Sequence, residues 1–315
     1  MHKLVVLALL AAGIAALFAI PAAANPRGTN GKIVIGSFNT ALGQDQVYSV
    51  DPDGSDFTLL VDNSSAGQWS YDGSRITVGN DALGQAIFDF DTGVLTSLDL
   101  GAQYPDLFLP CPVWSPDDKR LACEGGGQTD PSLNGIYTVR SSDGGGLQRV
   151  TSEPGCPSDY SPNGKRIVFE RWSVGELFTV KLDGSGLRQI TPDGMALGEC
   201  PGSWSPKGNE ILFSAHVPNA DYRSTTWVVH SDGTGLRQIP IPGCGGLFSS
   251  PTSISCFNPS WSPDGKKIVF GRLPATTGQR DLYTVNADGS GLFRVTNTPD
   301  VEEFGGDWGT HPVTP

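Results

Sequence analysis

The chain has 315 residues, enough for one large domain or two small ones, and its 38% hydrophobic content supports a packed core rather than disorder. Its formal net charge of −12, with no basic run, argues against binding to nucleic acid or to an anionic membrane surface, because both depend on Lys and Arg. The 41 glycines and 24 prolines suit many tight turns between short strands.

The first 24 residues have the layout of a secretory signal peptide. Lys3 supplies a positive start, residues 4–20 form an unbroken apolar run, and residues 22–24 offer a small-residue cleavage site. An uncleaved anchor is the alternative, but the apolar run is at the lower limit for spanning a bilayer. We therefore expect residues 25–315 to be secreted or periplasmic, with no stable membrane anchor after cleavage.

A strand–turn motif then recurs along the chain. Its clearest copies read WSPDGKKIVF at 261–270, WSPKGNEILF at 204–213 and YSPNGKRIVF at 160–169. The aromatic residues that open the copies are 44 to 57 residues apart: Trp69, Trp114, Tyr160, Trp204, Trp261 and Trp308. This period is close to that of one propeller blade, about 40–45 residues.

A second motif follows each copy, with an apolar strand, an Asp–Gly-like turn and another short strand. Each of these strands has an aromatic second residue: Tyr48, Phe88, Tyr137, Phe178, Trp227 and Tyr283. Asp-Gly between alternating runs is the strongest short-range signal for a β-hairpin. Each unit therefore has four strands, which we call a to d, with strand a ending at the Ser–Pro–Asp–Gly turn.

The two ends of the chain supply parts of one unit. Residues 32–35 form the first b strand, and nothing resembling a strand a precedes them, whereas the chain ends with an extra strand a near residues 305–310. Pairing the two ends would leave the ring without an open edge. We predict an all-β fold: a six-bladed β-propeller of four-stranded antiparallel blades, closed by the C-terminal strand.

These motifs resemble those of the TolB-like, Trp-Asp-repeat-like propeller family across nearly all of residues 31–310. The departures include Tyr71 in place of Pro and Asp118 in place of Gly. TolB itself has an additional N-terminal domain, whereas here only a few residues separate the expected cleavage from the first strand. We therefore expect the propeller alone, covering residues 25–315, and do not carry TolB's role in the Tol–Pal system over to this chain.

The repeated tryptophans are expected to pack between blades, because a repeated core fills the same space each time. The acidic turn at residues 51–56 is expected to be an ordinary hairpin; calcium binding is the alternative, but the glutamate that completes a calcium loop is missing. No Gly-x-Ser-x-Gly elbow occurs, and only His216, His230 and His311 follow the signal segment. We expect no catalytic residue, no metal and no cofactor.

Variable connections between strands b and c, and between d and a, lie on one face of the predicted ring. Function concentrates on loops that a rigid scaffold holds in place, and Arg and aromatic side chains are common interface anchors. The longest of these connections are residues 124–134, 214–224, 240–255 and 271–280. The candidate binding residues on this face are Arg171, Trp172, His216, Tyr222, Arg223, Phe248 and Arg272.

The six cysteines of an exported chain are expected to pair on this same face. Cys244 and Cys256 flank the longest loop, so a bridge between them would pin it. The expected remainder is Cys156–Cys200 between neighbouring blades and Cys111–Cys123 across one hairpin. Cys123 takes the place of a phenylalanine in three other units, so a buried free thiol is the alternative.

We predict a binding or scaffold module for a protein or peptide, working as a monomer and not as an enzyme. The alternatives are a propeller enzyme, such as a sugar lyase or a hydrolase-like protein, and a binder of a small ligand or metal in the central channel. A cluster of His and carboxylate side chains in the channel would favour the enzyme.

Overall fold

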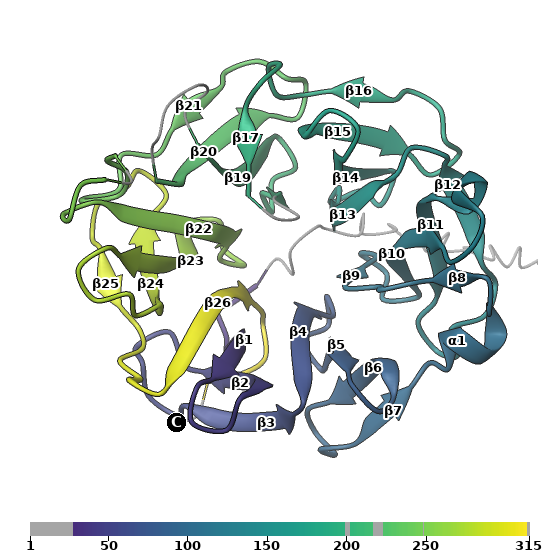
Figure 1. The fold of residues 1–315 in the computed structure, drawn as a ribbon, viewed down its shortest axis with the longest axis horizontal. Helices are drawn as coiled ribbons and strands as arrows, with labels where there is room; N and C mark the ends of the chain where they lie inside the picture. The colour runs from purple at the N-terminus through teal and green to yellow at the C-terminus, as the bar shows by residue number, and fades with distance from the viewer. Residues whose placement is uncertain (1–27, 199–201, 217–222, 248, 314–315) are drawn as a thin grey trace, which may run out of the picture.

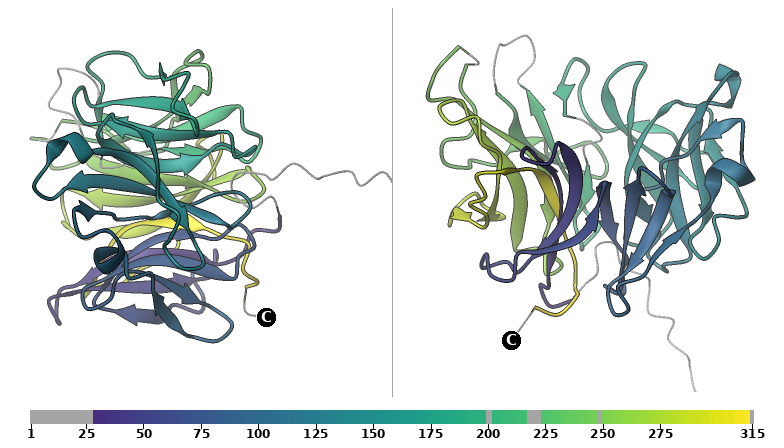
Figure 2. Two further views of the ribbon diagram at one scale, coloured as in Figure 1. Left: turned by 90° about the vertical axis from the view of Figure 1, so that its right-hand side faces the viewer. Right: turned by 60° about the horizontal axis from the view of Figure 1, so that its bottom comes forward.

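The structure is a computed structural model that describes residues 28–198, 202–216, 223–247 and 249–313. Its strands form six antiparallel sheets, which are arranged as blades around a central axis (Figure 1). The left view of Figure 2 shows the same ring edge-on. The predicted six-bladed propeller is confirmed.

Each blade runs outward from strand a beside the axis to strand d at the rim. From a to d, blade 1 contains β26 (Val301–Trp308), β1 (Ile33–Asn39), β2 (Gln44–Val50) and β3 (Thr58–Asp62). Blade 2 contains β4 (Ser64–Trp69), β5 (Arg75–Asn80), β6 (Gly84–Asp89) and β7 (Leu95–Ser97). In blade 3, strand a consists of β8 (Leu107–Phe108) and β9 (Val113–Trp114), followed by β10 (Arg120–Gly127), β11 (Gly135–Arg140) and β12 (Gln148–Thr151).

Blades 4 to 6 repeat the plan. From a to d, blade 4 contains β13 (Gly155–Tyr160), β14 (Arg166–Arg171), β15 (Glu176–Lys181) and β16 (Arg188–Gln189). In blade 5, strand a consists of β17 (Ala196–Leu197) and β18 (Ser203–Trp204), followed by β19 (Glu210–His216), β20 (Thr225–His230) and β21 (Arg237–Gln238). Blade 6 contains β22 (Ile254–Trp261), β23 (Lys267–Pro274), β24 (Asp281–Asn286) and β25 (Phe293–Arg294).

The C-terminal strand closes the ring, as predicted. β26 pairs with β1 antiparallel, from Ile33 opposite Trp308 to Asn39 opposite Val301. The indole Nε1 of Trp308 also donates a hydrogen bond to the carbonyl of Gly31 at 2.9 Å. Blade 1 is therefore built from both ends of the described chain.

Four details differ from the sequence prediction. A short helix, α1 (Leu100–Gln103), leads into blade 3, and the 3-10 helix η1 (Pro131–Leu133) lies in its b–c connection. Strand a is split in blades 3 and 5. Strands β10, β19 and β23 also extend into the connections that were expected to be loops. In the part of the chain that the structure describes, no helix is long enough and apolar enough to cross a membrane.

The repeated aromatic residues pack between blades, as predicted. Each of the six is at most 3% exposed: Trp69, Trp114, Tyr160, Trp204, Trp261 and Trp308. The indole of Trp114 also donates to the carbonyl of Gln68 in the preceding blade at 3.0 Å. These side chains fill the space between consecutive sheets, which fixes the angle of each blade against its neighbour.

The Ser–Pro–Asp–Gly turns lie on one face of the ring, which we call the turn face: residues 70–74, 115–119, 161–165, 205–209 and 262–266. Within these turns the polar groups satisfy one another. The Ser262 hydroxyl, for example, donates to Asp264 at 2.8 Å and accepts from the backbone N–H of Lys267 at 2.9 Å. The opposite face, which we call the loop face, holds the b–c and d–a connections.

The acidic turn at residues 51–56 lies on the turn face and joins β2 to β3. The ammonium of Lys32 lies 2.8 Å from Asp51 and 2.6 Å from Asp56. A lysine therefore pairs with these two carboxylates. This pairing is compatible with an ordinary hairpin, whereas in a calcium loop the carboxylates would bind the metal ion.

Candidate functional site

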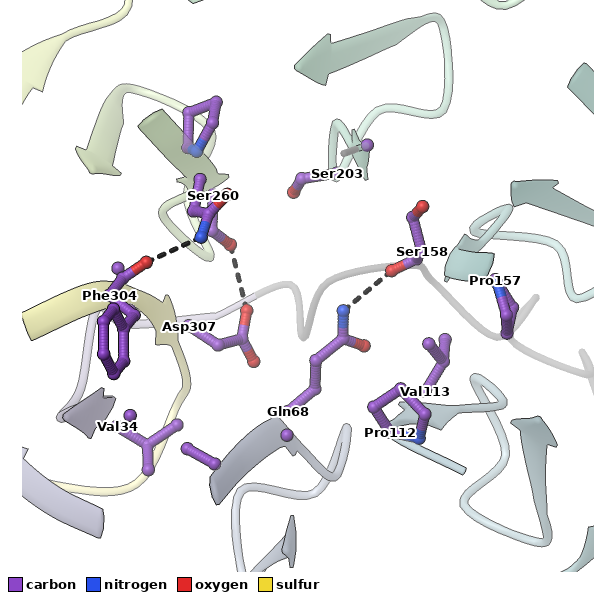
Figure 3. A pocket seen from close by; sticks show the side chains of 18 residues that line it. Val34, Gln68, Pro112, Val113, Pro157, Ser158, Ser203, Ser260, Phe304 and Asp307 are labelled. Atoms are coloured by element: carbon purple, nitrogen blue, oxygen red, sulfur yellow. Dashed lines mark hydrogen bonds between the residues drawn. The ribbon is translucent and has the colours of Figure 1, made fainter. Parts of the chain in front are cut away.

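The innermost strands of all six blades line a central channel of about 270 Å³ (Figure 3). Small side chains keep it open, among them Gly36, Ala66, Gly67, Gly202, Gly305 and Gly306, with Ser158, Ser203 and Ser260 beside them. Phe304 is the one aromatic residue among the described lining residues. The channel wall thus combines backbone and small polar groups with apolar side chains such as Val34 and Val113.

Polar side chains link neighbouring and more distant blades around this channel (Figure 3). The Gln68 amide of blade 2 donates to the carbonyl of Ser158 in blade 4 at 2.8 Å. The Asn258 amide of blade 6 donates to the carbonyl of Phe304 in blade 1 at 2.6 Å. These bonds hold the inner strands in fixed relative positions.

Two buried carboxylates join the blades at the channel: Asp307 lines it, and Asp159 belongs to the same inner layer of strands without lining it. Asp159 accepts a hydrogen bond from the backbone N–H of Trp204 at 2.7 Å, and Asp307 accepts one from Trp69 at 2.9 Å. Asp307 also accepts from the Ser260 hydroxyl at 2.9 Å. Burial raises the pKa of both carboxyls, and the nearby charge of Asp307 raises that of Asp159 further. Their backbone donors give both residues a structural role between blades.

On the loop face, two of the predicted arginines lie over aromatic rings of strand c. The guanidinium carbon of Arg171 is 5.4 Å from the ring centre of Phe178, and that of Arg272 is 5.0 Å from Tyr283. Arg171 also forms an ion pair with Glu153 at 2.5 Å. Arg272 donates to the carbonyl of Pro242 at 3.2 Å. These contacts hold both guanidinium groups in defined positions.

Sequence reasoning missed three further pairs of this kind; one of them, Arg75 over Trp114 at 4.9 Å, is next to the turn at residues 70–74 on the turn face, and the other two are on the loop-face side. Arg149 lies 5.7 Å from the ring centre of Tyr137, and Arg280 lies 5.0 Å from that of Phe304, which lines the channel. Arg149 is directly opposite Tyr137 in the strand register, because β11 pairs with β12. Strand pairing is therefore the signal that could have found the Arg149 pair; the Arg280 pair depends on how blade 6 lies against β26.

The other candidate residues are spread over the loop face. Trp172 is 49% exposed beside Arg171. His216 ends β19 in blade 5. Arg223 contacts the 240–255 loop, with its backbone N–H bound to Gly246 at 2.8 Å and its Nε bound to Ser253 at 3.2 Å. This loop brings Arg223 and Arg272 to one region, whereas Arg171 and Trp172 lie in blade 4. Tyr222 and Phe248 lie outside the described residues.

Two of the three predicted disulfides are confirmed. Cys244 and Cys256 are bonded, with their Cα atoms 5.7 Å apart, and so pin the 240–255 loop. Cys111 and Cys123 are also bonded, so the free-thiol alternative for Cys123 is wrong. Cys156 is disulfide-bonded as well, but its predicted partner, Cys200, lies outside the described residues, so that pairing stays a prediction. Such bridges persist in oxidising compartments.

Among the described residues, no group of three or more His, Cys, Asp or Glu side chains could hold a metal ion. The two buried aspartates carry hydrogen bonds that tie blades together. On the loop face, the described residues present four positioned guanidinium groups and an exposed indole.

The architecture and the repeat motifs define a six-bladed β-propeller of the TolB-like kind. No known protein-family profile matches the chain. An uncharacterized protein of Agrobacterium fabrum is 28% identical over 171 residues, which cover 50% of this chain and 53% of that protein. The Tol-Pal system protein TolB of Anaeromyxobacter dehalogenans is 27% identical over 158 residues, which cover 50% of this chain and 31% of that one.

Among solved structures, TolB from Acinetobacter baumannii aligns with a TM-score of 0.68 at 18% identity, over 88% of this chain and 66% of that one. An oligogalacturonate lyase in complex with manganese aligns with a TM-score of 0.54 at 14% identity, over 85% of this chain and 74% of that one. At these identities the likeness is one of fold, and propellers of this fold include both TolB and an enzyme.

Proposed function

We propose that the chain is an exported protein- or peptide-binding module that uses the loop face around the channel mouth. The single observation that carries this proposal is the set of guanidinium groups stacked on aromatic rings at Arg149, Arg171, Arg272 and Arg280. Arg and aromatic residues dominate the energetics of protein interfaces. A side chain that is already held in place loses little conformational entropy when a partner binds.

The contrast between the faces supports the proposal. On the turn face the short polar side chains bond to their own turns, as Ser115 does with Asp117 at 2.8 Å and Ser262 with Asp264 at 2.8 Å. Such groups have little to offer a partner. The loop face carries the longer connections, one of which is pinned by the Cys244–Cys256 bridge.

Export is part of the proposal. The N-terminal segment has the pattern of a cleaved signal, and the disulfides suit an oxidising compartment. The chain shares its propeller fold with TolB, which the name of one relative assigns to the Tol-Pal system. This fold is compatible with a periplasmic or secreted binding module.

The test is partner capture from envelope and culture-supernatant fractions of the source cell. The full chain is compared with Arg171→Gln/Arg272→Gln on the loop face and with Lys266→Ala/Lys119→Ala on the turn face, which removes two exposed charges of the same sign. We expect the loop-face variant to lose at least tenfold of a captured protein that the turn-face variant retains. Equal capture by all three proteins, or no specific capture by the unmodified chain, would contradict the proposal.

A further inference from the structure

A second cavity, of about 230 Å³, lies next to the channel among blades 2, 3 and 4. Its walls are mainly apolar, formed by Ala66, Val78, Pro110, Pro112 and Pro157. It shares four residues with the channel lining, namely Ala66, Gly67, Pro112 and Pro157. The two cavities are therefore neighbours, and a chain lying at the channel could direct a side chain into this pocket.

The glycine at position 79 keeps the pocket open. Gly79 is the residue after the apolar run of strand β5, and it lines the cavity. A methyl group added there would meet only the hydroxyl of Ser65, at 2.8 Å. No side chain from this position of blade 2 fills the space that faces blade 3.

Glu124 occupies the equivalent position of β10 in blade 3 and also lines the pocket. Its backbone N–H is bound to the carbonyl of Pro110 at 3.0 Å, which fixes the residue. Within the described part of the chain, its carboxylate has no hydrogen bond and no ion pair. Burial alone raises the pKa of this carboxyl, so no described charge nearby compensates for its lost hydration.

The other long polar side chain of the pocket is already engaged. Gln85 accepts from the backbone N–H of Cys111 at 2.6 Å and donates to the carbonyl of Val78 at 3.2 Å. Glu124 is thus the polar group of this pocket that remains available to a ligand. A carboxylate with apolar walls around it is complementary to a basic side chain, whose methylenes favour apolar contact and whose head group needs a counter-charge.

We propose that this pocket, formed by Gly79, Glu124 and the prolines at 110, 112 and 157, binds a Lys or Arg side chain of a partner polypeptide. The inference rests on the proposed binding function and specifies one contact of it. A cation that pairs with Glu124 gains more than it would at an open surface, because the carboxylate is partly desolvated before binding. The acidic chain, with a net charge of −12, also favours a basic ligand.

The direct test uses three blocked pentapeptides, Gly-Gly-X-Gly-Gly, in which X is Lys, Arg or the uncharged norleucine. Each is titrated into the purified full chain by calorimetry, up to 10 mM. We expect the Lys or Arg peptide to bind at least tenfold more tightly than the norleucine peptide. In Glu124→Gln, which keeps the shape but not the charge, this preference should disappear.

The matched control is Asp81→Asn, which removes the same charge from an exposed loop residue of blade 2. It should keep the full preference, and thermal melting should show that both variants are folded. Gly79→Val with Ser65→Ala is a second pocket variant: the Ser65 change removes the one atom that a Cβ at position 79 would meet, and the added methyl groups narrow the site without changing its charge, which should also weaken the basic peptides.

Three outcomes would overturn the inference: no saturable binding of the basic peptides, equal binding of the norleucine peptide, or a preference that survives in Glu124→Gln. n-Butylamine or ethylguanidine binding as tightly as the peptides would identify a site for free amines instead of a polypeptide. If partner capture on the loop face succeeds while Glu124→Gln has no effect, this inference fails and the proposed function stands. If neither the unmodified chain nor any variant captures a partner, both the proposed function and this inference fail.

Discussion

The two faces of the ring are built on different principles. On the turn face, one motif recurs in five blades, and its serine, acidic or amide side chain and backbone satisfy one another within the turn. On the loop face, no two connections are alike, two disulfides and several arginines hold the segments in place, and carboxylates remain unpaired or buried. The repeated turn motif stabilises the fold, whereas the connections that differ between blades carry side chains that are available to a ligand.

The largest expected difference between the faces concerns two tryptophans. Trp261, at the turn-face end of β22, is 3% exposed, whereas Trp172, after β14 on the loop face, is 49% exposed. We expect Trp261→Ala to lower the free energy of unfolding by about 3–5 kcal/mol, because it leaves a large cavity between blades. Trp172→Ala should change it by no more than about 0.5 kcal/mol.

Denaturant melts of both variants at one pH provide the measurement. A loss below about 1 kcal/mol for Trp261→Ala would show that its burial does little for stability. A loss above about 2 kcal/mol for Trp172→Ala would mean that the loop face is part of the core, which would abolish the contrast.

The second comparison concerns pH. Burial raises the pKa of Glu303 in β26 to about 8, and the neighbouring Asp281 raises it too, although the Thr298 hydroxyl donates to its Oε1. The folded state therefore holds this proton more tightly than the unfolded chain does. The resulting stability is complete below the unfolded pKa near 4.5 and is lost as pH rises toward 8, at up to about 1.4 kcal/mol per pH unit.

Glu303→Gln keeps the neutral shape without an ionisable proton. Its free energy of unfolding should match that of the unmodified chain near pH 4, below the unfolded pKa, and exceed it near pH 8. Melting at steps of one pH unit tests this, with Glu302→Gln, which is next to it but partly exposed, as the control. Parallel pH profiles for the unmodified chain and Glu303→Gln would rule out the buried proton.

The smallest expected effect concerns the contacts between the turns of neighbouring blades on the turn face. At three junctions between blades, the turn glycine lies against the proline of the preceding blade: Gly164 on Pro116, Gly208 on Pro162 and Gly265 on Pro206. Between blades 2 and 3 both residues differ. The N–H of Tyr71, which a proline would lack, donates to Asp118 at 2.6 Å, and the N–H of Asp72 donates to it at 3.0 Å.

Tyr71 and Asp118 are therefore a compensating pair. Tyr71→Pro alone removes a donor from a carboxylate whose pKa burial already raises to about 6, and Asp118→Gly alone leaves two N–H groups without this acceptor. The double variant restores the arrangement of the other junctions. We expect its loss of stability to be smaller than the sum of the single losses by about 1 kcal/mol, as measured in urea melts. Additive losses would show that the two departures are independent.

The sequence predicted the features that depend on position within one repeat: six blades, buried aromatic residues, ring closure and the bridges Cys111–Cys123 and Cys244–Cys256. It did not predict features that depend on how neighbouring blades approach each other. The ring of Phe304 meets Arg280 of another blade, Glu124 lines a cavity that Gly79 keeps open, and Tyr71 bonds to Asp118. Each of these contacts depends on the distance between neighbouring sheets, and the repeat pattern carries no information about that distance.

The closing strand has a consequence for how the chain folds. Trp308 bonds to Gly31, 277 positions earlier in the sequence, and β26 supplies the inner strand of blade 1. Blades 2 to 6 can assemble from neighbouring segments as the chain emerges, whereas blade 1 has to wait for the last residues, because pairing over such a separation is slow. Until then, β1 exposes an unpaired edge at the axis. The ring thus stays open until β26 has paired with β1.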